Sequence, residues 1–131
     1  MRRPAASLGL LTALAALAAL AAAAGCGGDD DGGGLANETV PSDPDVVILA
    51  QDMVFDPEDV EVPADQAVTI VIDNRDEGVN HNVHVEDAPE PNRTRLEQGV
   101  SQQALTVTLP AGEYEFVCDI HPNMTGTLVA G

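Results

Sequence analysis

The sequence predicts an all-β protein in which residues 46–131 form one antiparallel sandwich. Short runs rich in Val, Ile and Thr recur along this part of the chain, and Gly, Pro, Asn or Asp usually separates them. No stretch of it is convincing as a helix. Its length suits a single domain, and nothing in the sequence indicates a second.

The N-terminal segment has the layout of an export signal. Arg2 and Arg3 precede an apolar Leu/Ala stretch, residues 8–24, that is short for a membrane span. Small residues then lead to Cys26, as in a bacterial lipobox, although Ala23 stands where Leu is usual. We expect residues 1–25 to be removed and Cys26 to carry lipid; the alternative is an ordinary signal cut elsewhere, with Cys26 left as a thiol.

Residues 26–45 are predicted to be a flexible linker between the anchor and the sandwich. They are acidic, rich in Gly, and contain Pro41 and Pro44. A lipid anchor at Cys26 would hold the domain at the cell membrane on its extracytoplasmic side, the periplasmic side of the cell envelope. The tether would let the domain swing between membrane-associated partners.

The expected strands follow in order along the domain. Pro110-Ala111-Gly112 is predicted to be a tight turn, because Pro fixes φ and Gly can adopt φ > 0. Residues 86–103 are polar, contain two prolines, and are predicted to cross between the two sheets. The strands are expected at residues 46–50, 59–62, 67–72, 81–85, 105–109, 113–117 and 126–129.

The strong excess of acidic residues limits which classes of molecule can bind this protein. The chain has 22 acidic residues against five basic ones, all of them Arg, and a formal charge of −17. Loss of Arg2 and Arg3 with the signal would leave three Arg against the same 22 acidic residues, a charge of −19. Nucleic acid is therefore excluded as a partner. The acidity favours either a basic redox protein or simple solubility in the host's medium.

A group of candidate metal ligands lies near the C-terminal end of the predicted domain. Cys118, His121 and Met124 stand at C-x2-H-x2-M spacing, and His81 lies upstream in an apolar strand pattern. One thiolate, two imidazoles and a weak thioether suit both copper oxidation states, so an electron can move with little rearrangement. The pattern predicts an electron carrier.

Several further pieces, in order, resemble the cupredoxin family, and specifically its small amicyanin-like and plastocyanin-like members. The resemblance covers roughly residues 46–130, and the short spacing before Met124 is that of the amicyanin-like members. The matching pieces are Phe55-Asp56-Pro57, residues 60–64, Asn74, His81-Asn82-Val83, residues 109–114 and the loop from Cys118 to Met124.

The resemblance implies a Greek-key β-sandwich that binds one type-I copper ion and transfers electrons, and that is a monomer and not an enzyme. Cys118, His81 and His121 would be the ligands, with Met124 as a weak axial ligand. Electrons would pass through the ring edge of His121, inside an apolar patch formed by Pro122, Val79 and Met53. A basic cytochrome or a membrane oxidoreductase would be the redox partner.

Two positions beside these ligands, Asp119 and His84, bear on the site. In the relatives a hydroxyl after the Cys joins an Asn, at the position of Asn82 here, in tying the two ligand loops together. Asp119 stands at the hydroxyl position in this chain, and its carboxylate could accept from the Asn82 amide. Strand alternation sends His81, Val83 and Val85 to one face and His84 to the other, so His84 is predicted to be a solvated surface residue.

Two other functions stay open at this point. A copper-holding or delivery lipoprotein would use the same ligands, although such a carrier is expected to be richer in Met or Cys than this chain, which has three Met and two Cys. A zinc enzyme could use one thiolate and two imidazoles, but catalytic zinc needs an open position and a nearby base, and Met124 stands in that position.

Overall fold

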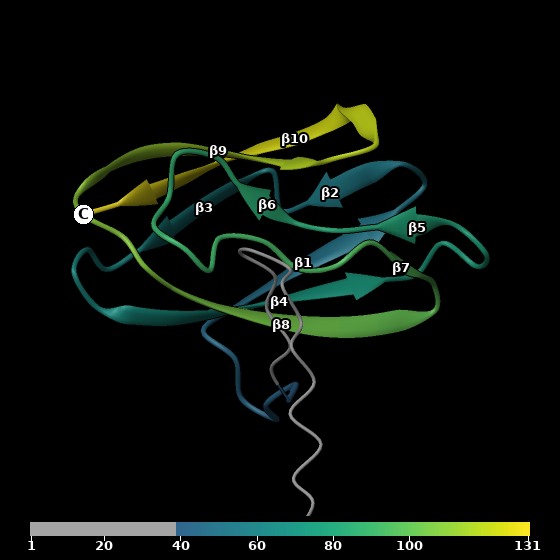
Figure 1. The fold of residues 1–131 in the computed structure, drawn as a ribbon, viewed down its shortest axis with the longest axis horizontal. Coiled ribbons are helices and arrows are strands. Elements are labelled where there is room, and N and C mark those ends of the chain that lie inside the picture. Colours follow the sequence, from purple (N-terminus) through teal and green to yellow (C-terminus); the bar gives the residue numbers. More distant parts are fainter. Residues whose placement is uncertain (1–38) are drawn as a thin grey trace, which may run out of the picture. The chain divides into compact units, whose positions relative to one another are not determined.

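The computed structural model describes residues 39–131, which form two four-stranded β-sheets and a two-stranded ribbon (Figure 1). The first sheet has the order β2 (Val54–Asp56), β1 (Val46–Gln51), β4 (Ala67–Asn74) and β8 (Ser101–Thr108). The second has the order β3 (Asp59–Val62), β10 (His121–Ala130), β9 (Gly112–Cys118) and β6 (His84–Val85). The ribbon pairs β5 (Asn80–His81) with β7 (Glu97–Gln98). The predicted all-β sandwich is confirmed.

Both sheets are mixed, whereas the sequence predicted an antiparallel sandwich. β1 runs parallel to β4, and β10 runs parallel to β3, while the other pairs are antiparallel. Parallel neighbours need a crossover connection. Between β1 and β4 this connection is made by β2 and β3, the second of which belongs to the opposite sheet, so the chain returns to the first sheet in its original direction.

The predicted strand over residues 81–85 is wrong as one continuous element. β5 pairs with β7 in the ribbon, whereas β6 pairs with β9 in the second sheet. Between them the buried Asn82 donates to the carbonyl of Thr94, and the N–H of Val83 donates to the hydroxyl of Thr94. The chain is therefore held by residue Thr94 while it passes from the ribbon to the sheet.

Other strand boundaries agree with the prediction more closely. β1, β3, β4 and β9 lie within two residues of their expected bounds, while β8 and β10 begin earlier than expected. The short strands β2 and β7 were not predicted. As expected, residues 86–103 connect a strand of one sheet, β6, with a strand of the other, β8.

The core lies between the two sheets and extends to one end of them. The Phe55 and Phe116 rings, one from each sheet, pack with centroids 5.5 Å apart. Gly126 lies against the Phe116 ring so closely that a Cβ atom there would overlap it. Burial of each large apolar side chain stabilises the fold by about 1.5–3 kcal/mol. The same buried cluster includes Cys118 and Met124, so the candidate ligands are continuous with the core.

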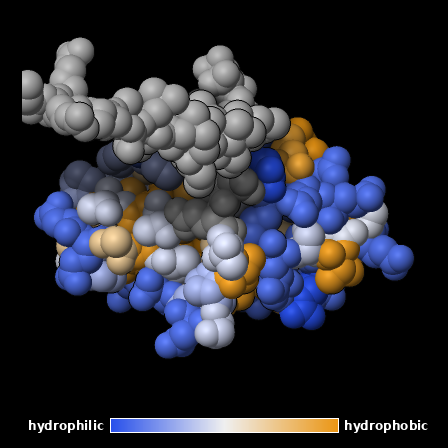
Figure 2. Space-filling model, turned by 60° about the horizontal axis from the view of Figure 1, so that its bottom comes forward, coloured by the Kyte–Doolittle hydropathy of each residue, from blue (hydrophilic) through white to orange (hydrophobic). Residues whose placement is uncertain are grey.

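The β9–β10 hairpin, the end of β4 and the β5–β7 ribbon meet at the same end of the sandwich (Figure 1). On the face drawn in Figure 2, hydrophilic residues cover most of the visible surface of the described part, and hydrophobic residues form separate groups. Within residues 39–131 no helix is long and apolar enough to span a membrane. The predicted signal, residues 1–25, and Cys26 lie outside the described residues, as does most of the linker over residues 26–45.

Candidate metal centre

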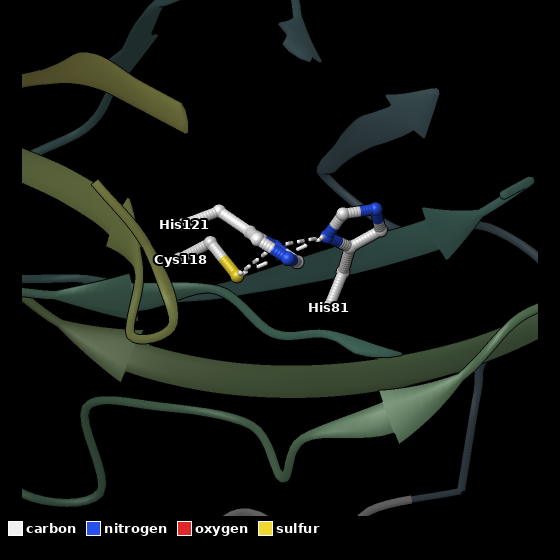
Figure 3. A group of neighbouring side chains, drawn as sticks. All are labelled: His81, Cys118 and His121. Atoms are coloured by element: carbon white, nitrogen blue, oxygen red, sulfur yellow. Dashed lines mark hydrogen bonds between the residues drawn. The ribbon is translucent and has the colours of Figure 1, made fainter. Parts of the chain in front are cut away.

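The side chains of His81, Cys118 and His121 converge at this end of the sandwich (Figure 3). Nδ1 of His81 lies 3.0 Å from Nδ1 of His121. Sγ of Cys118 lies 3.4 Å from Nδ1 of His121 and 3.9 Å from Nδ1 of His81. Two residues of one hairpin and a third from a distant part of the sequence therefore each direct one donor atom at a common centre.

The β9–β10 hairpin places two of these donors. Cys118 is the last residue of β9 and His121 is the first of β10, and the two residues pair across the hairpin. The register shifts between His121 and Thr125, so the pairing is interrupted where the hairpin carries the site. Cys118 is buried, and it is a free thiol.

The third donor comes from the β5–β7 ribbon. His81 pairs with Glu97 there, and its side chain is fully buried, with 0% of its surface exposed. The carboxylate of Asp76 lies 2.8 Å from the other ring nitrogen, Nε2. The orientation of the imidazole is therefore set by the backbone on one side and by a carboxylate on the other.

Met124 lies on β10, three residues after His121, and only 1% of its surface is exposed. Its side chain belongs to the buried cluster that also contains Cys118. The thioether is therefore kept from water on the core side of the hairpin.

Asn82 and Asp119 exchange two hydrogen bonds beside the cluster. Nδ2 of Asn82 donates to Oδ2 of Asp119 over 2.7 Å, and the Asp119 N–H donates to Oδ1 of Asn82 over 3.0 Å. These bonds tie the segment after His81 to the residue after Cys118. A carboxylate thus makes the contact that the sequence suggested for it.

The prediction that His84 is a solvated surface residue is wrong. The prediction that its side chain points to the face opposite Val83 and Val85 agrees with the structure, since both valines are fully buried. Nδ1 of His84 lies 2.8 Å from Oδ1 of Asp119, and only 20% of the His84 side chain is exposed. Strand alternation fixes the face a side chain points to, but the hairpin residue Asp119 covers that face here.

The surroundings of Asp119 favour its ionised form. Its burial alone would raise the pKa, but the hydrogen bonds from Asn82 and His84, with the charges of His84 and Arg93, outweigh burial and lower the pKa. The pKa of His121 is also lowered, because burial and the neighbouring His81 disfavour its cation more than Asp76 favours it. The lowered pKa of His121 favours its neutral imidazole, the form that can bind a metal.

The three donors fit a soft transition metal. Bonds of about 2.0–2.3 Å to nitrogen and sulfur, as at zinc, would separate donors in a trigonal arrangement by roughly 3.5–3.8 Å. The two observed sulfur–nitrogen separations, 3.4 and 3.9 Å, lie on either side of this range, and the nitrogen–nitrogen separation of 3.0 Å is shorter. One thiolate and two imidazoles suit copper or zinc rather than magnesium or calcium, which prefer oxygen.

A β-sandwich with a thiol and two imidazoles gathered at one end is the architecture of a small metal-binding protein. The family described as Cupredoxin-like domain matches residues 10–130. The chain belongs to this family. No curated protein matches the sequence.

Solved structures resemble the chain over most of its length. Auracyanin A from Chloroflexus aurantiacus, described as a "blue" copper protein, is 25% identical with a TM-score of 0.56; the match covers 68% of this chain and 100% of that one. Amicyanin from Paracoccus versutus is 28% identical with a TM-score of 0.53, over 74% of this chain and 90% of that one. Auracyanin from Roseiflexus castenholzii, at 20% identity and a TM-score of 0.59, covers 70% and 99% and shows the fold alone.

Sequence reasoning missed two residues that hold the site. Asp76 bonds to His81, and Thr94 receives hydrogen bonds from Asn82 and Val83. Asp76 lies in the loop between β4 and β5, five residues before His81, and Thr94 lies in the connection between β6 and β7, eleven residues after Val83. No sequence spacing identifies an isolated Asp or Thr as a hydrogen-bond partner of the segment around His81. The roles of Asp76 and Thr94 are therefore visible only in the folded structure.

Proposed function

We propose that the protein is a blue copper electron carrier whose copper ligands are His81, Cys118, His121 and Met124. The observation that carries the proposal is the convergence of one thiol sulfur and two Nδ1 atoms, all within 4.8 Å of one another. Copper bound there would supply one-electron chemistry. The similarity to auracyanin A and amicyanin supports the same reading.

The chain's own residues would keep the rearrangement between oxidation states small. Cys118 and His121 are fixed by their pairing in the hairpin, and His81 is fixed by the ribbon and by Asp76. Cys118 and Met124 are buried, so water is kept from that side of the site. Donors that stay in place in both oxidation states are what rapid one-electron transfer requires.

A carrier fits the surroundings of the site better than an enzyme does. A hydrolytic enzyme needs an open metal position and a carboxylate free to act as a base. The carboxylates nearest the cluster, Asp76 and Asp119, are both engaged in hydrogen bonds with neighbouring side chains. A copper nitrite reductase from Thermus scotoductus also resembles the chain, with 24% identity and a TM-score of 0.53, but the match covers only 24% of that protein.

Electrons would enter and leave through His121, the more exposed of the two histidines. Its ring is half-buried, and the neighbouring Ile120 and the turn residue Met53 are 47% and 42% exposed. Weak apolar contact there would suit a partner that must leave again. The strong negative charge favours a basic partner, such as a cytochrome or a membrane oxidoreductase, with association that slows as salt is added.

The test is the visible spectrum of the purified, Cu(II)-loaded protein. An intense thiolate-to-copper charge-transfer band is expected, and Cys118→Ser should abolish it. His84→Ala serves as the control, since His84 contacts Asp119 rather than the donor atoms and should leave the band in place. A colourless Cu(II) complex of the unaltered protein would show that the blue copper assignment is wrong. Ready transfer of copper to an apo-acceptor would favour a delivery function instead.

We also propose, from the sequence, that the mature protein is a lipoprotein held at the extracytoplasmic side of the cell membrane through Cys26. Two acyl chains on one cysteine suffice for stable anchoring, each buried CH₂ contributing about 0.8 kcal/mol. Cys26→Ala should release the protein or leave it uncleaved, with an unchanged copper spectrum. Mass spectrometry of the N-terminal peptide, with membrane fractionation of both forms, checks this. An unmodified Cys26 in a soluble native protein would contradict the anchor and leave the copper proposal intact.

A further inference from the structure

Asp76 contacts the ring nitrogen of His81 that faces away from the donor cluster. Its Oδ2 atom lies 2.8 Å from Nε2 of His81, whose side chain is fully buried, while the Asp76 side chain itself is 14% exposed. The pair joins the loop after β4 to the β5–β7 ribbon. It lies on the side of the imidazole opposite the donor cluster, since the cluster is contacted by Nδ1.

The chemistry of the pair decides which ring nitrogen carries the proton. An ionised carboxylate can only accept hydrogen bonds, so Nε2 of His81 must be the donor. A neutral imidazole has one proton, and Nδ1 is then left with a free lone pair directed at Cys118 and His121. This is the tautomer that a metal ligand needs at Nδ1.

Asp76 is itself held by the β1–β2 turn. Oδ1 accepts from the N–H of Asp52 over 2.8 Å, and Oδ2 accepts from the N–H of Met53 over 3.2 Å. Asp52 and Met53 both have positive φ, 54° and 65°, a conformation that costs free energy for residues other than glycine. Two hydrogen bonds to one carboxylate help to offset that cost, and they fix the carboxylate where it meets His81.

These contacts support the ionised form of Asp76. Both carboxylate oxygens already accept backbone N–H groups, and with the carboxylate as acceptor in the third contact as well, Nε2 of His81 is the donor.

We propose that Asp76 is a positioning residue for the metal centre: anchored by the backbone of the β1–β2 turn, its carboxylate holds His81 as the Nε2–H tautomer with Nδ1 facing Cys118 and His121. Its negative charge, one hydrogen bond from a ligand, also favours the more oxidised metal and lowers the reduction potential. The effect on the potential rests on the copper function proposed above, whereas the effect on the tautomer does not.

The experiment compares Asp76→Ala and Asp76→Asn with a matched control, Asp65→Asn. Asp65 is an exposed carboxylate with positive φ before the start of β4, whereas Asp76 follows the end of that strand. The control therefore removes the same charge at the opposite end of the sandwich. Three quantities are measured: the His81 tautomer in the metal-free protein by ¹⁵N NMR of the ring nitrogens, the affinity for Zn²⁺, and the reduction potential with copper.

The unaltered protein and Asp65→Asn should show His81 with the proton on Nε2. Asp76→Ala should show a mixture of tautomers and a Zn²⁺ affinity lower by about 10–100-fold, the usual effect of removing such a partner. Asp76→Asn should keep the Nε2–H tautomer, because an amide oxygen can still accept, and should raise the reduction potential above that of Asp65→Asn.

An unchanged tautomer in Asp76→Ala would overturn the proposal, as would a potential in Asp76→Asn no higher than in the control. If Asp76→Ala fails to fold, Asp76→Asn still tests the charge through its potential, and a loss of its Nε2–H tautomer would also count against the proposal. A missing blue band in the unaltered protein would contradict the copper function alone, because the tautomer and the Zn²⁺ affinity remain measurable without it.

Discussion

His81 and His121 present the same atom, Nδ1, to the same thiol, yet their surroundings differ sharply. His81 is fully buried and held through Nε2 by Asp76. His121 is half-buried at the start of β10, and the hydrogen bonds that the structure shows for its ring are made by Nδ1. His81 is therefore part of the protein interior, whereas His121 lies at the protein surface.

This difference divides two tasks between chemically identical side chains. A ligand locked by a carboxylate keeps the donor geometry fixed, and a ligand at the surface shortens the distance to a partner protein. The Asn82–Asp119 pair joins the two regions, since Asn82 follows His81 and Asp119 follows Cys118 in the hairpin that carries His121. The site therefore combines a rigid side and an accessible side.

The largest expected effect comes from removing each histidine in turn. His81→Gly and His121→Gly should both lose the charge-transfer band of the Cu(II) protein. Added imidazole at millimolar concentration should restore the band in His121→Gly, because the ring it replaces is partly exposed, and should fail in His81→Gly, where the space is enclosed. Absorption spectra with and without imidazole measure the difference.

A stability measurement sharpens the same comparison. His81→Gly leaves the carboxylate of Asp76 without its histidine partner, and a lost hydrogen bond to a charged group costs about 1.5–3 kcal/mol. His121→Gly should be destabilised less, as judged by urea unfolding of the metal-free variants. Equal rescue of both variants by imidazole, or a larger loss of stability in His121→Gly, would contradict the division between the two histidines.

A smaller effect is expected from Met124→Leu, which changes a buried residue on the same strand as His121. Copper should stay bound and the reduction potential should rise, because loss of the weak thioether donor costs Cu(II) more than Cu(I). Met53→Leu is the matched control, because the Met53 side chain is exposed on the β1–β2 turn. The reduction potential of this variant should stay near that of the unaltered protein. Potentiometric titration measures both variants. Loss of copper from Met124→Leu would assign Met124 a structural role instead.

The sequence was informative where a residue's own chemistry or periodicity carries the signal. The alternation of β-branched residues located β1, β3, β4 and β9, and the C-x2-H-x2-M spacing selected Cys118 and His121, which the structure brings together with His81. These features are local or chemically distinctive. A short spacing on one hairpin allows few arrangements in space.

The sequence was less informative where contacts join distant loops. Asp76 has no distinguishing neighbour in the sequence, and its role depends on the β1–β2 turn, which includes a strand, β2, too short to predict. The break between β5 and β6 depends on Thr94, which lies in a polar connection. Long-range hydrogen bonds leave no periodic trace, so these parts of the site required the three-dimensional structure.

The smallest expected effect is the pH dependence of the stability contributed by the Asn82–Asp119 pair, which connects the segment after His81 to the hairpin. The folded protein lowers the pKa of Asp119, because the hydrogen bonds and charges around the carboxylate outweigh its burial. A lowered pKa gives stability that is present above the unfolded value, about 3.9, and is lost as pH falls through the folded value. Asp119→Ser keeps an acceptor for Asn82 but has no charge to titrate.

At pH 7 the metal-free Asp119→Ser variant should therefore be less stable than the unaltered protein by about 1–2 kcal/mol, the usual worth of a charged hydrogen bond in a partly exposed position. The difference should shrink as pH falls from 5 toward 2, because protonation removes the same interaction from the unaltered protein. Urea unfolding across this range measures it in both proteins. If the free energies of unfolding of the two proteins change in parallel with pH, the charge of Asp119 adds no stability. The hydrogen bonds with Asn82 alone would then connect the segment of the buried histidine to the hairpin.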